Sequence, residues 1–456
     1  MGRSLRVTNG ILPRLPSGIL FPDRLPVSIL GMSSMAVSRP GVSSTVTDAG
    51  SASWDSRLIP LLLFGAAAVS MFFRLPEARL GAGFETIAVA RSIAAQGQFA
   101  NPYSTLATGP TAHVAPLYPA FLALLIRIFG YSATFGLVAS FCSVIVHGLH
   151  AAILPRISEV FFQDRRPGIL SALLSIFLPL YFFFPQFEVI YFATALMLFC
   201  LASYRLASRG GGWRGLAAGM ALGSVALLNP ASITVTVPWL AYACWRYLKH
   251  RRRAFLLCAA LGAVAALAPW TWRNYRQFHA WFLVRDNLGL ELFVSNTDGA
   301  QATFQQNNLS GLYRSRNPNL SLSETREIAR LGEIAYNRQR LAAALAWMRG
   351  NPSKFLALSA WRAREFWLPD AEGSPFYAIG IGLVTIASVF AFILLAVRRQ
   401  PITLFLGATL LLYPIMYYLV ENDPRFRAPI LWISLLGTGY LLVDIRNRLR
   451  PRRTSA

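Results

Sequence analysis

The stretch GFETIAVARSIAAQGQF, residues 83–99, carries a single acid, Glu85, shortly after the first long apolar segment of the chain. A carboxylate within hydrogen-bond reach of a hydroxyl group can take up its proton while the oxygen attacks an electrophile. An acid in the first turn of a helix is also favoured by the helix dipole, without any chemistry. The position of Glu85 therefore indicates either a general base or a charge that starts a helix.

Two arginines near the C-terminus could hold an anion. In ENDPRFRAPI, residues 421–430, Arg425 and Arg427 alternate with Phe426. A locally extended backbone would direct both guanidinium groups to one side and the phenyl ring to the other. Two planar guanidinium groups suit the oxygens of a phosphate at the membrane surface. The alternatives are anchoring to lipid headgroups and pairing with the two acids of the same stretch.

Five further residues are weaker candidates for substrate contacts. Arg273 and Asn274 follow a long apolar segment on the expected outer side, where basic residues run against the usual charge bias, and so could contact phosphate. Glu188, near the start of an apolar segment, indicates either a functional acid or a helix cap. In PTAHVAPLYP, His113 could contact a substrate or pack at a helix entry, and Tyr118 could anchor the chain at the membrane interface.

The elements that position these residues are predicted to cross a membrane. Hydrophobic residues make up 55% of the 456 residues and charged residues only 14%. A spanning helix needs about 20 mostly apolar residues. Eleven full spans cannot place both long polar segments on one side of the membrane with the N-terminal tail on the other, so 10 or 11 spans are expected. The sequence predicts an all-α polytopic membrane protein. The candidate segments are Leu58–Phe73, Pro116–Phe129, Ala133–Leu154, Gly168–Phe184, Phe187–Tyr204, Gly215–Leu228, Ala231–Tyr247, Ala254–Trp270, Phe376–Val397, Ile402–Val420 and Ala428–Val443.

The net charge of +23 raises the question of a nucleic-acid partner, which its distribution argues against. The basic residues cluster in short segments beside apolar ones, at 205–214, 246–253, 398–399 and 446–453. Such clusters mark the cytoplasmic side of a membrane protein. The two long polar loops, 74–115 and 271–376, are then expected outside. The bilayer is the expected environment, in a bacterial inner (plasma) membrane, and no nucleic acid is expected to bind.

The polar parts of the chain have a predicted organisation of their own. Residues 1–57, rich in Pro, Gly, Ser and Arg, are expected to form a disordered cytoplasmic tail, and residues 446–456 a basic one. Within the second loop, Ser321 and Glu324 predict a capping box that starts a helix over 321–350. Asn351 and Pro352 predict the start of another over 351–367. These helices lie on the outer membrane surface or form a small soluble subdomain.

The cysteines indicate no metal or disulfide chemistry. All four fall inside apolar segments, without the Cys-x-x-Cys or Cys/His spacing of a zinc site. We therefore expect neither a metal nor another cofactor.

Several of these stretches resemble a known superfamily. GFETIAVARSIAAQGQF, followed by TGPTAHVAPLYPAFLALLIRIFG, resembles the first external loop of the C-fold membrane glycosyltransferases. This superfamily includes protein O-mannosyltransferases and bacterial aminoarabinose transferases. Further matches follow in order across residues 58–443: FPQFEVIYFATALMLF, GLAAGMALGSVALLNP, APWTWRNYRQF with NLGLELFVSN, and ENDPRFRAPI.

The resemblance implies a C-fold domain over residues 58–445 and a reaction. Such enzymes move a sugar from a polyprenyl-phosphate donor to an acceptor glycan, lipid or protein outside the membrane. Glu85 matches their presumed base by position, although many members carry Asp, or an Asp-Glu pair, at this point. Arg425 and Arg427 match the arginines at the family's end, with Arg273 as a further donor-phosphate contact. Attack from the face opposite the leaving phosphate implies inversion at the sugar.

Two other classes of protein share this composition. A transporter or lipid flippase should show halves related by an internal repeat, and acids within its helices. No convincing repeat is present, and the acids lie mainly in loops. A scaffold subunit has no need for a carboxylate and arginines outside the membrane. The sequence therefore favours the glycosyltransferase and keeps the transporter as its alternative.

Overall fold

The computed structural model describes residues 51–73, 85–178, 188–248, 252–370 and 374–449, with side chains from residue 58 onward. Within these ranges the chain forms α-helices, two short 3-10 turns and two isolated bridges but no strand, which confirms the all-α prediction. The predicted tail over 1–57 and the start of the loop 74–115 lie mostly outside the described residues. Helix α1 (Ser51–Phe72) begins before the predicted Leu58, and the last helix continues to Leu449, into the predicted basic tail.

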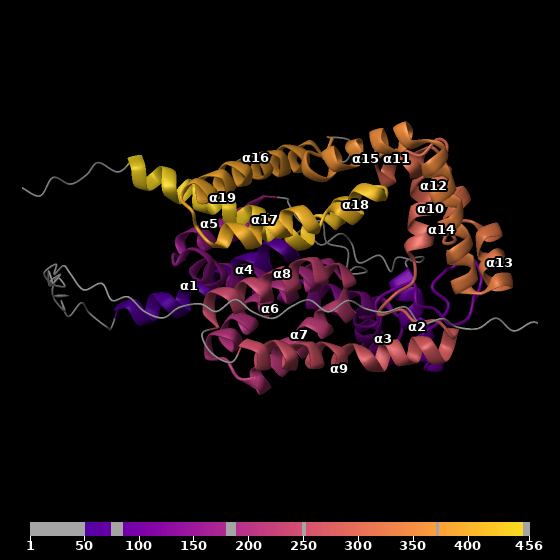
Figure 1. The fold of residues 1–456 in the computed structure, drawn as a ribbon, viewed down its shortest axis with the longest axis horizontal. Helices are drawn as coiled ribbons and strands as arrows, with labels where there is room; N and C mark the ends of the chain where they lie inside the picture. The colour runs from indigo at the N-terminus through magenta and orange to yellow at the C-terminus, as the bar shows by residue number, and fades with distance from the viewer. Residues whose placement is uncertain (1–50, 74–84, 179–187, 249–251, 371–373, 450–456) are drawn as a thin grey trace, which may run out of the picture. The chain divides into compact units, whose positions relative to one another are not determined.

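The apolar helices follow the predicted segments (Figure 1). Six in the described ranges are long and apolar enough to cross a bilayer: α4 (Ala133–Phe162), α6 (Val189–Arg209), α9 (Arg252–Phe278), α16 (Pro375–Val397), α17 (Ile402–Leu412) taken with α18 (Ile415–Leu419), and α19 (Ala428–Leu449). Shorter apolar helices are the stretch Leu58–Phe72 of α1, α3 (Leu117–Phe129), α5 (Arg166–Phe177) and α7 (Gly212–Leu228), and α8 (Ile233–Tyr247) follows a further predicted segment. A helix of 12 to 17 residues rises only about 18–26 Å. By length and composition, six helices of the described ranges qualify as spans, and the count of 10 or 11 stays a prediction.

Glycines let α7 and α9 approach closely. Gly215, Gly219 and Gly223 recur every fourth residue on one face of α7, opposite Gly262 of α9. A Cβ atom on Gly219 would lie 1.8 Å from the carbonyl oxygen of Ala259. Small residues at this spacing allow membrane helices to gain van der Waals contact along their backbones. This packing joins α7 to α9, which leads into the second predicted loop.

Aromatic side chains fill the main core between α4, α8, α17 and α19. The ring of Trp239 lies against Phe161 and Phe405, with centroids 5.2 and 5.0 Å apart, and Trp432 contacts Phe161. The indole N–H of Trp239 donates to the Ser203 hydroxyl at 2.8 Å. The polar group of this buried residue is therefore satisfied, as a low-dielectric interior requires.

The second loop forms short helices at one end of the membrane helices (Figure 1): α10 (Leu288–Ser295), α11 (Phe304–Leu309), α12 (Leu312–Arg316), α13 (Leu322–Leu331), α14 (Glu333–Gly350) and α15 (Pro352–Trp367). The predicted helix over 321–350 is wrong in one respect, because it breaks at Gly332, whose φ is +79°. Ser321 caps α13 as predicted, but the Glu324 carboxylate binds Tyr336 and Arg340 instead of closing a capping box. Pro352 starts α15, whereas the Asn351 side chain makes no capping bond.

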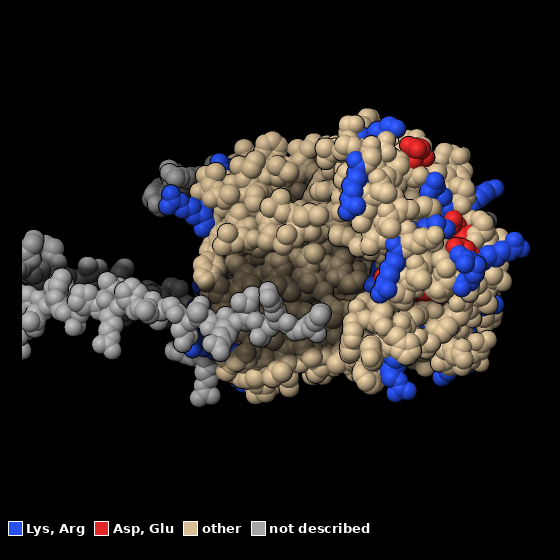
Figure 2. Space-filling model, turned by 45° about the vertical axis from the view of Figure 1, so that its right-hand side comes forward, with Lys and Arg blue, Asp and Glu red and all other residues tan. Residues whose placement is uncertain are grey.

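The helices of this second loop have a small core of their own. Tyr103 from the first loop packs with Leu290 and Val294 of α10, Ile328 of α13 and Tyr336 of α14. A shared core favours the small subdomain over separate helices lying on the lipid surface. Figure 2 shows charged side chains gathered at this end and some Lys and Arg at the opposite end, whereas the surface between them that the grey atoms leave visible is almost free of charge. The uncharged face is the kind of surface that contacts lipid.

Candidate active site

A pocket of about 440 Å³ lies where the loops predicted to be external meet the apolar helices. It takes residues from α2 (Glu85–Gln96), the loop before α3, the starts of α6 and α8, and α10. Two 3-10 turns, η1 (Pro230–Ser232) and η2 (Pro424–Phe426), also contribute. Its charged and imidazole side chains are those of Glu85, His113, Glu188, Arg285, Glu291 and Arg425. Aromatic and aliphatic side chains supply most of the remaining wall.

Glu85 begins α2 and makes contacts far along the chain. Its Oε1 accepts a hydrogen bond from the Asn319 amide and lies 3.8 Å from Nε2 of His113. The other ring nitrogen of His113 lies 3.4 Å from the Tyr103 hydroxyl. Glu85 does occupy the first turn of α2, as expected of a charge that starts a helix, but its side-chain partners come from two loops. The structure therefore joins Glu85 and His113, which the sequence treated separately.

The pKa values of this pair are shifted in opposite directions. Burial alone would raise the pKa of Glu85, but the His113 side chain, and more weakly the charge of Arg425, bring it below its ordinary value. Burial alone would lower the pKa of His113, but Glu85 raises it above its ordinary value. Each charge thus stabilises the other. At neutral pH Glu85 is a carboxylate, the form that a base requires.

The predicted extended backbone at residues 425–427 is wrong. Pro424 to Phe426 form the 3-10 turn η2, because Pro424 restricts its own φ and the Asp423 carboxylate accepts a hydrogen bond from the Arg425 N–H at 2.9 Å. The two arginines consequently point in different directions. Arg425 lines the pocket, whereas Arg427 is buried and donates to the carbonyl oxygen of Trp367 at 2.8 Å.

Arg273 and Asn274 lie outside the pocket lining. The Arg273 guanidinium donates to the carbonyl oxygens of Thr111 at 2.8 Å and Phe99 at 2.9 Å. Asn274 is buried, and its amide lies 3.4 Å from the carbonyl oxygen of Val284. Both residues bind loop carbonyl oxygens, so Arg273 has protein partners without a phosphate.

Glu188 and Tyr118 do line the pocket. Glu188 stands at the N-terminus of α6 but makes no capping bond with its side chain; its Oε1 accepts from the Asn229 amide at 3.0 Å. Tyr118 is only 3% exposed, and its ring lies 5.1 Å from that of Tyr191. The prediction of Tyr118 as an interface anchor is therefore wrong, because an anchor has to reach the headgroup layer.

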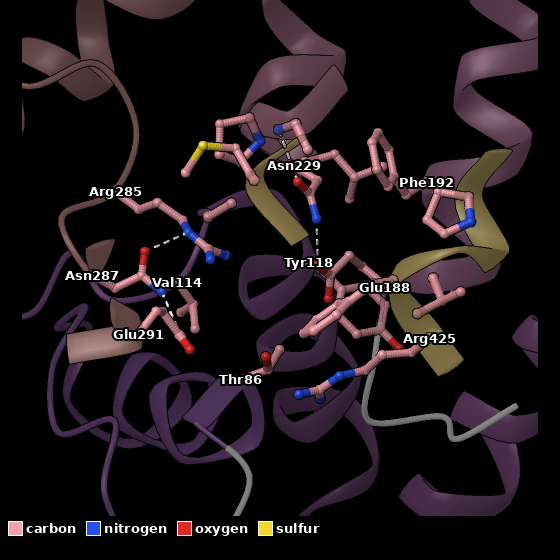
Figure 3. A pocket seen from close by; sticks show the side chains of 18 of the residues that line it. Thr86, Val114, Tyr118, Glu188, Phe192, Asn229, Arg285, Asn287, Glu291 and Arg425 are labelled. Carbon is pink, nitrogen blue, oxygen red and sulfur yellow. Dashed lines mark hydrogen bonds between the residues drawn. The ribbon is translucent and has the colours of Figure 1, made fainter. Parts of the chain in front are cut away.

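Sequence reasoning missed one wall of the pocket. Arg285 donates through Nε to Asn287 Oδ1 at 2.9 Å, and the Asn287 amide donates to Glu291 Oε1 at 2.9 Å. Figure 3 shows this chain on one side of the pocket and Arg425 on another. The signal was present, because Asn287 and Glu291 are four residues apart and so share a helix face. No group of three or more metal-ligating side chains occurs in the described ranges.

Comparisons with known proteins support the fold. No protein-family model and no curated protein matches the chain. A solved structure does: the archaeal oligosaccharyltransferase AglB from Archaeoglobus fulgidus, in complex with an inhibitory peptide and a dolichol-phosphate. The match has a TM-score of 0.51 at 14% identity, and covers 87% of this chain but only 51% of that one. It shows a likeness of fold to that structure, while the resemblance to the C-fold superfamily, and to protein O-mannosyltransferases and aminoarabinose transferases within it, stays a prediction.

Proposed function

We propose that this protein is a membrane glycosyltransferase that moves a sugar from a polyprenyl-phosphate donor to an acceptor hydroxyl outside the membrane. The observation that supports this most is the convergence of Glu85, His113 and Arg425 on one pocket at the outer end of the helices. The fold likeness to an oligosaccharyltransferase whose complex contains a dolichol-phosphate points the same way. The sugar stays open, as does the choice of glycan, lipid or protein as acceptor.

In the proposed reaction Glu85 acts as the base. As the acceptor oxygen forms its bond to C1 of the sugar, the hydroxyl proton passes to the Glu85 carboxylate. The bond from C1 to the phosphate oxygen breaks, and its electron pair leaves with the polyprenyl phosphate. Arg425, and Arg285 from the opposite wall, are suited to bind the negative charge on the departing phosphate. His113 keeps Glu85 ionised, and attack opposite the leaving group inverts C1.

The test is release of free polyprenyl phosphate. Purified protein in nanodiscs is incubated with radiolabelled undecaprenyl-phosphate hexoses and pentoses and with a crude envelope extract as acceptor. A glycosyltransferase liberates the lipid phosphate and transfers the label, whereas a flippase moves the intact donor. If no donor in the panel is cleaved while labelled donor crosses the bilayer of proteoliposomes, the proposal is wrong and the transporter alternative holds.

The sidedness of the pocket is part of the proposal. We place the external helices in the periplasm and the loop after α6 in the cytoplasm, because of the arginine clusters beside the apolar helices. Ser310, between α11 and α12, and Ser208, in the last turn of α6 beside that loop, are both exposed. In a cysteine-free background, a membrane-impermeant maleimide should label S310C and spare S208C in intact cells. The reverse labelling pattern would place the pocket on the wrong side for an external acceptor.

A further inference from the structure

Glu333, the first residue of α14, is a buried carboxylate that the proposed reaction does not use. Its Oε1 accepts a hydrogen bond from the Ala112 backbone N–H at 2.7 Å, and its Oε2 accepts one from the Thr111 hydroxyl at 2.5 Å. These partners lie 221 and 222 residues away along the chain. The external subdomain therefore extends a carboxylate to the turn that immediately precedes His113.

Three further hydrogen bonds stabilise the same turn. The Thr111 hydroxyl oxygen also accepts from the His113 backbone N–H at 3.0 Å. Arg273 donates to the Thr111 carbonyl oxygen at 2.8 Å, and the Asp286 backbone N–H donates to the Ala112 carbonyl oxygen at 3.0 Å. The position of His113 is thus determined by contacts from three separate segments of the chain.

We propose that Glu333 is a positioning residue, which holds the Thr111–Ala112 turn and thereby keeps the His113 side chain beside Glu85. The inference rests on the proposed roles of Glu85 and His113, but its first test needs no sugar donor. Two converging donors suit the paired oxygens of a carboxylate. If the Glu333 carboxylate is removed, the buried Ala112 N–H and Thr111 hydroxyl lose their acceptor. An unsatisfied buried donor costs free energy, so the turn is expected to open toward water.

Substitutions at Glu333 can distinguish the effect of its hydrogen bonds from the effect of its charge. Burial raises the pKa of Glu333 to about 7, against the lowering effects of Thr111 and His113. The ionisable groups that act on it electrostatically include His113, Asp286, Arg273 and Tyr103. A glutamine at this position can still accept from Ala112 and donate to the Thr111 oxygen, so E333Q should keep the turn. An alanine can do neither.

The test is chemical labelling of His113 in the full-length protein in nanodiscs. Diethyl pyrocarbonate modifies exposed imidazoles, and mass spectrometry follows the rate at His113, with the exposed His279 as internal reference. In the parent His113 is only 5% exposed and should react slowly. E333A should speed its modification by about tenfold or more, whereas E333Q should stay much closer to the parent.

The matched control is Glu324, a carboxylate of the same subdomain that bonds Tyr336 and Arg340 rather than the turn. E324A should leave the His113 rate unchanged. If E333A fails to fold, Glu333→Asp is the second variant: its side chain is one methylene shorter and cannot reach both Thr111 and Ala112 from the same backbone, so it should also speed labelling. Labelling of His113 at the parent rate in folded E333A, or equal acceleration in E324A, would overturn the proposal.

Turnover gives an independent second readout. If a donor is cleaved, E333A should lower kcat and E333Q should restore most of it, which a residue needed only for folding would not predict. If no donor is cleaved by the parent protein, the proposed function fails while the labelling result still decides whether Glu333 holds the turn.

Discussion

Replacing Glu85 with Gln should slow sugar transfer by about 10²–10⁴-fold, the usual contribution of a general base. The variant should fold, because the glutamine carbonyl oxygen can still accept from Asn319 in place of Glu85 Oε1. What disappears is the proton acceptor and the negative charge beside His113. At about 1.36 kcal/mol for each factor of ten, the expected rise in the barrier is roughly 2.7–5.4 kcal/mol.

The assay is single-turnover release of undecaprenyl phosphate at saturating donor, so that binding does not limit the rate. Glu327→Gln is the matched control, because this carboxylate lies on α13, outside the pocket lining, and its bonds go to Arg330. The control should react like the parent. A Glu85→Gln variant that keeps more than about one tenth of the parental rate would refute the role of Glu85 as base and leave it a helix-start charge.

The remaining predictions address the donor, the packing and the pH dependence. Arg425→Lys should weaken binding of undecaprenyl phosphate about tenfold or more in a titration by native mass spectrometry. Arg427→Lys should bind normally but unfold at lower temperature, because the arginine bonds two buried carbonyl oxygens. Gly219→Ala should cost about 1–3 kcal/mol of stability, since its Cβ would overlap α9; the control Gly65→Ala, where no atom lies within 4 Å, should not lower the unfolding temperature, because alanine is the better helix former. The pKa of His113 is raised above the ordinary 6.5, so the stability from its acidic partner is fully present below that pH and is lost as pH rises through the raised value. Thermal unfolding should show this loss on the alkaline side, and His113→Asn should abolish it.

Several features of this protein follow from the sequence because they depend on near neighbours. The apolar segments predicted the positions of α3 to α9 and α16 to α19, since burial in lipid requires long apolar runs whatever the tertiary fold. Ser321 caps α13 through a bond to a backbone group three residues away. Glu85 could be chosen as a candidate base because it is an acid at the point where the chain leaves an apolar helix.

Only the tertiary structure decided which side chains meet. Arg427 points away from the pocket because η2 replaces the extended backbone that alternation suggested. Arg273 binds loop carbonyl groups, while Arg285, which no motif singled out, faces the cavity. Glu333 reaches a turn more than two hundred residues earlier in the chain. Periodicity records which face of an element is apolar, but the partners of a polar side chain are set by long-range packing, which local spacing does not encode.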